Sequence, residues 1–599
     1  MSGAPREDPR SEYEARLEAR RAEAAHWAQR GRAIANARLV VFGAGAALAW
    51  WVLASGAMAR AWLLLPVAAF VGLVIAHDRA RLARERAQRA AAYYAGGLAR
   101  IDCRFAGSGR SGERFADPSH PYASHLDLFG RGSLFERLSR AQTRAGEETL
   151  ARWLCEAAGV DEIRARQEAL AELRPRLDLR ERQAVVGPEV RAGIDPERLI
   201  AWGAAKRLRS LSSLRWTAAS VVALSLLGAG LAFWTGVGLA PLLAALGIQG
   251  VFALAVRTRV QRVMRDALEP VRELCVFAKL LEGLERESFE SAQLRELSAA
   301  LRVSQELPSR QIARLARLVD LLDARRNQLF APLAALLLWS SQLAFAIEAW
   351  RRVCGAELAC WLEVTGSLEA LLDLAGYTFE CPGDAFPELV EAGPIFEGTG
   401  LGHPLLLESR CVRNDVSLSH ELALLVVSGS NMSGKSTLLR TVGTNAVLAL
   451  AGAPVRATRL RISPLGLGAS LRVQDSLQEG TSRFYAEIRG LHTVVELCDE
   501  PRPVLFLFDE ILQGTNSHDR RIGAAALARG LIERGAIGLI TTHDLALAKI
   551  VDELAPRARN VHFEDQLVNG EMHFDYRLRE GVIQKSNALA LMRSVGLDV

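Results

Sequence analysis

Two long stretches with almost no charged residues dominate the pattern of hydrophobic and polar positions along the chain. The first consists of two apolar runs, Leu39–Ala59 and Ala61–Ala76, which are separated only by Arg60. The second, Trp216–Val256, contains no charged residue and has a turn signal at Thr235–Gly238. A helix needs about 20 apolar residues to cross the hydrocarbon core of a bilayer. The pattern therefore predicts two helical hairpins that are apolar enough to span a membrane.

The alternative interpretation of these stretches is a pair of hairpins buried in a large soluble core. A core helix of such length usually carries charge along its outer face. These runs do not, so we favour the membrane for both. Trp216 and Trp234 bracket the first half of the second hairpin, as interfacial aromatic residues do. A third apolar stretch, Leu329–Trp350, contains Gln342, Glu348 and two serines, and is expected to be a core helix.

Arginines flank both hairpins on each side, and they predict the orientation. Basic residues beside membrane spans stay in the cytoplasm. All four flanks are therefore expected on the cytoplasmic side of the cytoplasmic membrane, together with the rest of the chain. The flanking residues are Arg30, Arg32, Arg38, Arg79, Arg81, Arg84 and Arg86 around the first hairpin, and Arg207, Arg209, Arg215, Arg257, Arg259 and Arg262 around the second.

The other regions of the chain read as helices followed by an α/β domain. Leucine-rich, charge-laced segments at Leu126–Leu173 and Glu269–Leu374 predict long helices. The Pro-Gly pair and second proline of Cys381–Pro387 mark a break, after which the sequence is richer in strands and glycines. We place the start of the α/β domain near Phe386.

Length, charge and cysteine content narrow the class of protein. A chain of 599 residues is expected to form three or four units. A net charge of +5 is only a weak indication of nucleic acid or anionic lipid as a partner. The eight cysteines include no C-x-x-C pair, so neither a zinc site nor a disulfide framework is indicated. The polar N-terminal 38 residues do not predict a cleavable signal peptide.

A phosphate-binding loop lies between a predicted strand and a predicted helix. Gly429–Ser436 fits G-x-x-x-x-G-K-[ST], preceded by the apolar strand Glu421–Ser430 and followed by the helix Lys435–Gly452. In such a loop Lys435 bridges the β- and γ-phosphates, and Ser436 ligates Mg²⁺. The nucleotide-binding residues predicted here are Gly429, Ser430, Asn431, Met432, Ser433, Gly434, Lys435, Ser436 and Thr437, with ATP and Mg²⁺ as cofactors.

Two further strands supply candidate catalytic residues. In "VLFLFDE" five apolar residues lead into Asp509 and Glu510, the Walker B arrangement. Asp509 is predicted to hold Mg²⁺, and Glu510 to act as the general base for the attacking water. A third strand, Ala536–Asp544, brings His543 near its end. An isolated histidine is usually structural, but this position fits the γ-phosphate-sensing histidine of ATP-binding-cassette-type ATPases. Lys435, Glu510 and His543 are thus the predicted catalytic set.

Several motifs resemble the MutS family of DNA mismatch repair ATPases. The loop "GSNMSGKSTLLR" has that family's Asn-Met pair, and "DEILQGTNSHD" resembles its Walker B segment. The resemblance implies a homodimer in which Ser482 reaches, in trans, the γ-phosphate bound by the partner, with DNA as a further partner. Other matching segments are Val473–Ile488, Gly400–Leu406, Val412–Asp415 and Gln584–Leu597 in the ATPase region, and Leu126–Leu154 with Ile163–Leu173 in the helical core and lever region.

The resemblance gives the expected fold class and domain organisation. We expect a P-loop ATPase domain of the ATP-binding-cassette type, C-terminal to an all-α core and lever domain, with two apolar hairpins across the membrane. The expected segments are a charged helix at 1–38, hairpin 39–76, basic helix and linker 77–124, helical core 125–215, hairpin 216–256, helical core and lever 257–385, and ATPase domain 386–599.

The departures from the family leave the function open between three interpretations. No counterpart of the family's mismatch-reading N-terminal domain is found, and the apolar hairpins are additional. We favour a membrane-anchored MutS-like ATPase that moves a helical lever and acts on DNA in mismatch repair or a related transaction, or on a protein partner without DNA. The second interpretation is a soluble mismatch repair ATPase with buried hairpins. The third, a transporter-like ATPase, ranks last because the spans contain no charge to mark a substrate path.

Overall fold

The computed structural model describes residues 8–582 except 56–58, 191–194, 206–210, 235–237, 303–305, 324–330, 431, 472–482, 544–547 and 569–570. It divides the chain into two compact units. Unit 1 comprises residues 1–140, 150–177 and 371–599, and unit 2 comprises residues 141–149 and 178–370. The chain passes from one unit to the other within α4 (Arg144–Cys155), within α14 (Leu358–Glu380), at the start of α6 (Leu177–Val190), and in the short segment between α3 (Leu134–Leu138) and α4. The predicted domain boundaries remain predictions.

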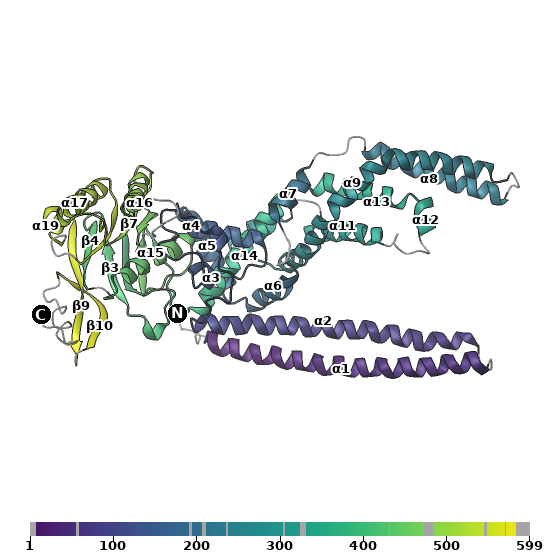
Figure 1. Ribbon diagram of the computed structural model, residues 1–599, viewed down its shortest axis with the longest axis horizontal. Helices are drawn as coiled ribbons and strands as arrows, with labels where there is room; N and C mark the ends of the chain where they lie inside the picture. Colours follow the sequence, from purple (N-terminus) through teal and green to yellow (C-terminus); the bar gives the residue numbers. More distant parts are fainter. Residues whose placement is uncertain are drawn as a thin grey trace. The chain divides into compact units, whose positions relative to one another are not determined.

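A long helical hairpin forms the N-terminal part of unit 1. Helix α1 (Pro9–Ser55) lies along α2 (Leu64–Ile101), and the short 3₁₀ turn η1 (Arg60–Leu63) precedes α2 (Figure 1). Both helices are long and apolar enough to cross a membrane by length and composition. The apolar ends of the two helices are exposed, with Leu39 at 78 % and Trp50 at 79 % of their maximal surface.

The opposite end of this hairpin is anchored in unit 1. Tyr13 and Leu17 of α1 and Tyr94 of α2 are buried against Phe379. Next to this cluster, the buried carboxylate of Glu380 pairs with arginines from two different segments. The hairpin thus has one end packed into protein and one end whose large apolar side chains are exposed.

The α/β part of unit 1 contains two sheets. The larger sheet has the strand order β10-β9-β4-β8-β7-β6, parallel throughout except for the β9–β10 pair. The smaller sheet has the order β1-β5-β2-β3. The strands are β1 (Glu388–Leu389), β2 (Phe396–Leu401), β3 (Asn414–Leu418), β4 (Leu424–Ser428), β5 (Arg459–Ile462), β6 (Gly466–Ser470), β7 (Val504–Asp509), β8 (Ile537–Thr542), β9 (Ala558–Val568) and β10 (Glu571–Glu580).

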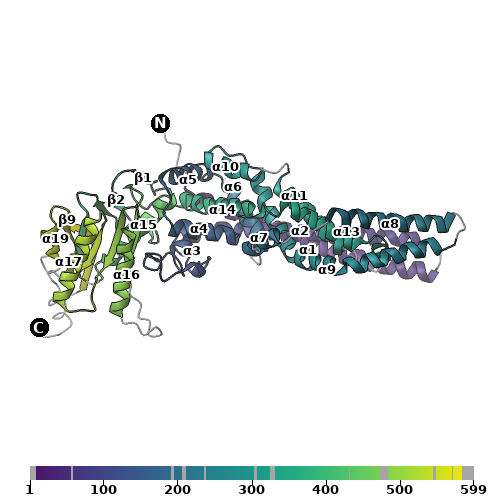
Figure 2. The ribbon, with the colours of Figure 1, turned by 90° about the horizontal axis from the view of Figure 1, so that it is seen from above.

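Helices surround the larger sheet, which explains why its central strands are continuous apolar runs. A parallel strand covered on both faces has no polar side, and every residue of β4 and β8 is buried. Figure 2 shows the α/β part from above, with α16 and α17 beside the strands. Its helices are α15 (Lys435–Ala451), α16 (Arg483–Leu497), α17 (Ser517–Glu533) and α19 (Ile550–Leu554), with the 3₁₀ turn η4 (Glu408–Arg410) before β3.

The remaining elements of unit 1 are helical. Ser133 caps α3 by accepting the amide of Glu136 (3.2 Å), as serine commonly does at a helix start. These elements are η2 (Glu113–Phe115), α3 (Leu134–Leu138), α5 (Val160–Leu173), the second half of α4 (Arg144–Cys155) and the C-terminal half of α14 (Leu358–Glu380).

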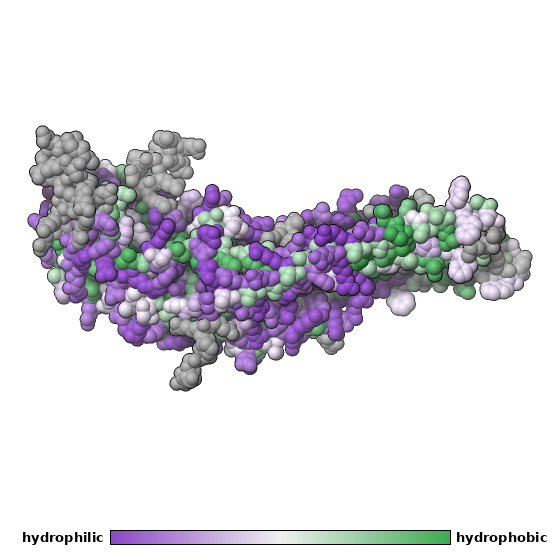
Figure 3. All heavy atoms as spheres, turned by 90° about the horizontal axis from the view of Figure 1, so that it is seen from below, coloured by the Kyte–Doolittle hydropathy of each residue, from purple (hydrophilic) through white to green (hydrophobic). Residues whose placement is uncertain are grey.

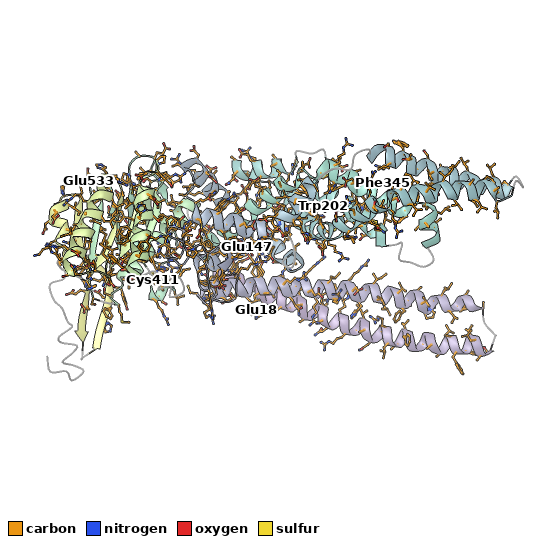
Figure 4. The ribbon with its side chains drawn as sticks, turned by 45° about the horizontal axis from the view of Figure 1, so that its top comes forward. Glu18, Glu147, Trp202, Phe345, Cys411 and Glu533 are labelled. Carbon is orange, nitrogen blue, oxygen red and sulfur yellow. The ribbon has the colours of Figure 1, made fainter. Side chains whose placement is uncertain are left out.

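Unit 2 consists of helices in the residues that the structure describes. Trp202 of α7 stacks on Trp350 of α13 with ring centroids 6.1 Å apart, and Phe345 belongs to a buried cluster with α8 and α9 (Figure 4). Its helices, besides parts of α4 and α14, are α6 (Leu177–Val190), α7 (Pro196–Ala204), α8 (Leu211–Trp234), α9 (Ala240–Glu285), α10 (Ala292–Ala300), α11 (Pro308–Asp323), α12 (Ala331–Leu336) and α13 (Trp339–Cys354).

Helices α8 and α9 form the second hairpin and are also long and apolar enough to cross a membrane. The predicted turn at Thr235–Gly238 lies outside the described residues except for Gly238. Figure 3 shows hydrophobic residues gathered toward the ends of the long helices, at the right of the view. The third apolar stretch is not the single core helix that we expected, because Leu338 adopts a left-handed conformation (φ 46°) between α12 and α13.

Candidate nucleotide-binding site

The phosphate loop follows strand β4 and leads into helix α15. Gly434 has φ +103°, a conformation that residues with a side chain rarely adopt, and stands directly before Lys435 at the helix start. An added Cβ on Gly434 would also lie 3.1 Å from the ring of Tyr576. Glycine at position 434 therefore allows both the positive φ and the close approach of Tyr576. The N-terminus of α15 directs backbone amides toward the loop, where anions are stabilised.

Lys435 lies across the loop and meets the acidic end of strand β7. Its Nζ donates to the carbonyl of Gly429 at 2.7 Å and to that of Ser430 at 2.9 Å. The same atom is 3.3 Å from Oε1 of Glu510. The other carboxylate oxygen of Glu510 is 3.3 Å from Nδ1 of His543. The structure thus brings together the three residues predicted to be catalytic.

Sheet order explains this meeting point. Strand β8 lies between β4 and β7 and is parallel to both, so the three carboxyl ends share one edge of the sheet. Ligands of open α/β sheets bind at that edge. Thr541 of β8 donates its hydroxyl to Asp509 and accepts the amide of Glu510 at 3.0 Å. Adjacent strands therefore fix both acidic residues.

A cavity of about 640 Å³ occupies this edge of the sheet. Ser436 and Asp509 both line it, and together they offer the hydroxyl and carboxylate oxygens that Mg²⁺ prefers. Among the described residues no group of three or more metal-ligating His, Cys, Asp or Glu side chains is found. The predicted residues on the wall of the cavity are Ser430, Met432, Gly434, Lys435, Ser436, Thr437, Asp509 and Glu510.

The other predicted site residues have different positions. Gly429 lies directly after β4 and contributes its carbonyl to Lys435. Ser433 is buried under the loop, and His543 is partly exposed beside Glu510. Asn431 and Ser482 lie outside the described residues, so the predicted roles of both remain predictions.

The sequence did not predict one wall of the cavity. It is formed by residues from the segment around β2 and β3 and by Tyr576 of β10. Asn414 connects these parts, because its amide nitrogen donates to the carbonyl of Tyr576 (3.0 Å) and its oxygen accepts the amide of Leu578 (2.8 Å). Figure 4 labels Cys411, which lies in the same wall. The motif around Asn414 was noticed only as part of a family resemblance.

His403 belongs to the same wall and is kept neutral by its surroundings. Burial, followed by the positive charges of Arg440 and Arg456, lowers the pKa of His403 to about 4. Its Nδ1 accepts the backbone amide of Leu405 at 3.2 Å. That nitrogen therefore carries no proton in this arrangement, and protonation would cost the hydrogen bond.

Strand order, loop and acidic strand end define a P-loop nucleotide-binding domain. Residues 425–598 match the family model of MutS domain V. The chain is 32 % identical over 203 residues to an "Endonuclease MutS2" of Thermus thermophilus and 34 % identical over 200 residues to a "DNA mismatch repair protein MutS" of Natronomonas pharaonis. It is 29 % identical over 270 residues to "DNA mismatch repair protein MSH6" of Arabidopsis thaliana.

These matches identify the family through the C-terminal part of the chain. The C-terminal part of the chain, residues 425–598, is therefore assigned to MutS domain V. The aligned segments cover 33 %, 33 % and 42 % of this chain, and 25 %, 23 % and 20 % of the three relatives. The chain thus spans about a quarter or less of the length of these relatives, and the family resemblance of the helical segments upstream remains a prediction.

Proposed function

We propose that this protein binds ATP with Mg²⁺ and hydrolyses it at the edge formed by β4, β8 and β7. The observation that carries the proposal is the position of Glu510, with one carboxylate oxygen 3.3 Å from Lys435 and the other 3.3 Å from His543. A carboxylate beside a phosphate loop can accept a proton from the attacking water. The match of residues 425–598 to MutS domain V supports the proposal.

The proposed reaction assigns one role to each group. Water attacks the γ-phosphorus and passes a proton to the carboxylate of Glu510, while the bond between the γ-phosphorus and the β–γ bridging oxygen breaks to give ADP and inorganic phosphate. Lys435 neutralises charge on the β- and γ-phosphates, and His543 contacts the γ-phosphate. Ser436 and Asp509 would hold Mg²⁺, which supplies further neutralisation of the phosphate charge.

The test of this proposal separates binding from turnover. Lys435→Ala should weaken binding of a fluorescent ATP analogue. Glu510→Gln should bind that analogue with wild-type affinity and hydrolyse ATP more slowly by roughly 10²-fold or more. Glu533→Gln, an exposed glutamate on α17, serves as the matched control and should hydrolyse at the wild-type rate. Wild-type turnover in Glu510→Gln would remove Glu510 from the role of general base.

We further propose that the protein acts as a homodimer on DNA, in mismatch repair or a related transaction. The support is the family relationship, since two of the relatives cited above are named DNA mismatch repair proteins. Ser482 would complete the partner's nucleotide site. Binding to duplex, mismatched and branched DNA at several salt concentrations tests the DNA part, because phosphate contacts make affinity salt-dependent. Full activity of a strictly monomeric species would contradict the dimer.

Membrane anchoring by the two hairpins, with the ATPase domain in the cytoplasm, is the remaining part of the proposal. Four described helices are long and apolar enough to span a bilayer, and 0–22 % of each apolar window is buried. Such exposure favours lipid contact over the soluble interpretation, because large exposed apolar surfaces are rare on soluble monomers. The nucleotide cycle would then move the helical lever next to the membrane.

Thiol labelling tests this topology. A cysteine in place of Leu239, an exposed residue at the start of α9, should react with a membrane-impermeant maleimide added outside intact cells. A cysteine in place of exposed Glu533 should react only after lysis. The native Cys360 is exposed and is replaced by serine in both variants. Labelling of both positions only after lysis would contradict the proposed spans.

A further inference from the structure

The turn after the Walker B strand contains two left-handed residues that are not glycine. Glu510 has φ 49° and Leu512 has φ 58°. Residues with side chains rarely adopt such conformations, and a bulky residue does so only where the surrounding structure holds it. Because Glu510 is itself one of the two residues, the contacts that hold this turn also set the direction of its carboxylate.

Leu512 is held at its amide, its carbonyl and its side chain. Its N–H donates to the carboxylate of Glu487, a buried residue of α16. Its carbonyl accepts from Nε of Arg520 at 3.1 Å. Its side chain lies over α17, where a Cβ added to Gly523 would come within 2.9 Å of Leu512 Cδ1. The strained residue is therefore fixed by two helices.

Arg520 forms several hydrogen bonds to the backbone of this turn. Besides Leu512, its Nη2 donates to the carbonyls of Gln513 and Thr515, both at 3.2 Å. One guanidinium thus binds three carbonyl oxygens of the same turn. Its planar, forked set of donors suits this geometry, whereas the single ammonium of lysine presents its donors from one point.

On the other side of the turn, strand β8 supplies the second anchor. The N–H of Glu510 donates to Oγ1 of Thr541 at 3.0 Å and to the carbonyl of the same residue at 3.3 Å. The start of the turn is thereby bound to the sheet, and its remainder is bound to α17 through Arg520. These anchors fix the backbone of the turn, and Nε2 of Gln513 within the turn donates to the carboxylate of Glu510.

We infer that Arg520 is a positioning residue for ATP hydrolysis: it holds the Glu510–Thr515 turn, with Leu512 left-handed, so that the carboxylate of Glu510 stays between Lys435 and His543. The inference rests on the proposed hydrolysis. Arg520 is not on the wall of the nucleotide cavity, and it acts through the backbone of the turn. Its loss should therefore change the rate of the chemical step and leave nucleotide binding in place.

The first experiment compares single variants of the full-length protein in detergent. Arg520→Ala should lower kcat by about tenfold or more, since displacement of a reacting group by about 1 Å can cost up to 10²-fold. KM for ATP and the affinity for a fluorescent ATP analogue should stay within about twofold. Arg520→Lys should be nearly as slow, because lysine cannot bind the three carbonyls together. Arg521→Ala, the neighbouring exposed arginine, is the control and should match the wild type.

A double variant decides between positioning and a general structural role. Glycine adopts a positive φ without strain, so Leu512→Gly combined with Arg520→Ala should recover most of the turnover that Arg520→Ala loses. Wild-type turnover in Arg520→Ala would overturn the inference. So would a loss of turnover that Leu512→Gly does not recover, whether or not Arg520→Ala still binds nucleotide. Absence of hydrolysis in the wild-type protein would instead contradict the proposed function itself.

Discussion

The α1–α2 hairpin and the central sheet are built from similarly apolar sequence, but their side chains have opposite surroundings. All five residues of β4 are buried, whereas Leu39 and Trp50 of α1 expose more than three quarters of their surface. In the sheet, strands and helices of the same unit cover each apolar residue. In the outer part of the hairpin, each helix covers only one side of the other. Hydropathy thus identifies the apolar residues, whereas the three-dimensional contacts show whether other protein residues cover them.

A buried ion cluster anchors the α1–α2 hairpin to other helical segments of unit 1, and its removal is expected to have the largest effect on stability. Burial raises the pKa of Glu380, but the charges of Arg100, Arg140 and Arg137 lower it more, so the net pKa lies below its usual value. Glu380→Gln would leave these guanidiniums without their carboxylate. Removing one partner of a buried pair costs about 3–5 kcal/mol.

Denaturant unfolding in detergent measures that cost. Glu18→Gln is the control, because Glu18 belongs to the same hairpin and is exposed (Figure 4). Its effect should be below about 0.5 kcal/mol. A change of similar size in both variants would show that the hairpin is not anchored through Glu380.

The second prediction applies one chemical change to both regions. Leu507 of β7 is 1 % exposed and Leu39 of α1 is 78 % exposed. Leu507→Ala should lower the free energy of unfolding by about 2–5 kcal/mol, since it leaves a cavity in the sheet's core. Leu39→Ala should change it by less than about 0.5 kcal/mol. Equal losses, measured by denaturant unfolding in the same detergent, would mean that another surface of this chain covers Leu39.

The third prediction concerns pH and the nucleotide-binding wall of the sheet region. The folded pKa of His403 is about 4, below the ordinary value of about 6.5. Between these values the unfolded chain binds a proton that the folded chain does not. Stability should therefore be complete above about pH 6.5 and fall by up to about 3 kcal/mol as the pH drops to 4.

Substitution identifies the residue responsible for this pH dependence. His403→Gln should flatten the unfolding free energy between pH 4 and 6.5, measured by denaturant titration at several pH values. His518→Gln, at an exposed histidine of α17, should leave the slope unchanged. A wild-type slope in His403→Gln would show that another group titrates in this window.

The nucleotide site divides into a part that the sequence predicts and a part that it does not. The phosphate loop is a contiguous motif, and Asp509, Glu510 and His543 each follow an apolar strand, so local patterns are sufficient to find them. These residues lie close together because their strands are neighbours in the sheet. Asn414 and Tyr576 are 162 residues apart, and their contact follows from packing of the two sheets that no local pattern encodes.

The fold shows the same division. The apolar runs predict the long helices of both hairpins, and the strand–loop–helix pattern predicts the P-loop domain that the MutS domain V match supports. The division into two units could not be predicted, because two of its four boundaries fall inside the continuous helices α4 and α14. The break at Leu338 was also missed, because "LLLWSS" is compatible with an uninterrupted helix and the left-handed residue depends on tertiary contacts.

The last and smallest effect is predicted for a polar group inside the second hairpin. Gln249 of α9 donates to the carbonyls of Ala335 and Leu336 at 3.1 and 2.8 Å and accepts from the hydroxyl of Ser225 at 2.6 Å. Asn445 of α15 makes a comparable set of bonds, to the carbonyls of Gly402 and Thr441 and from the amide of Arg456. Both amide side chains are buried, so they can be compared directly.

Replacement of each amide by leucine sharpens the comparison between a hairpin in lipid and a core in water. Polar bonds between membrane helices are worth about 0.6 kcal/mol on average and at most about 1.7, because the unfolded state in the membrane also finds partners. In the core, unsatisfied buried groups cost about 1–3 kcal/mol each, and Asn445→Leu leaves two, the carbonyl of Gly402 and the amide of Arg456. Gln249→Leu should therefore cost about 1 kcal/mol and Asn445→Leu several times more, measured by denaturant unfolding in lipid nanodiscs. A loss at Gln249 as large as that at Asn445 would favour a hairpin buried in protein.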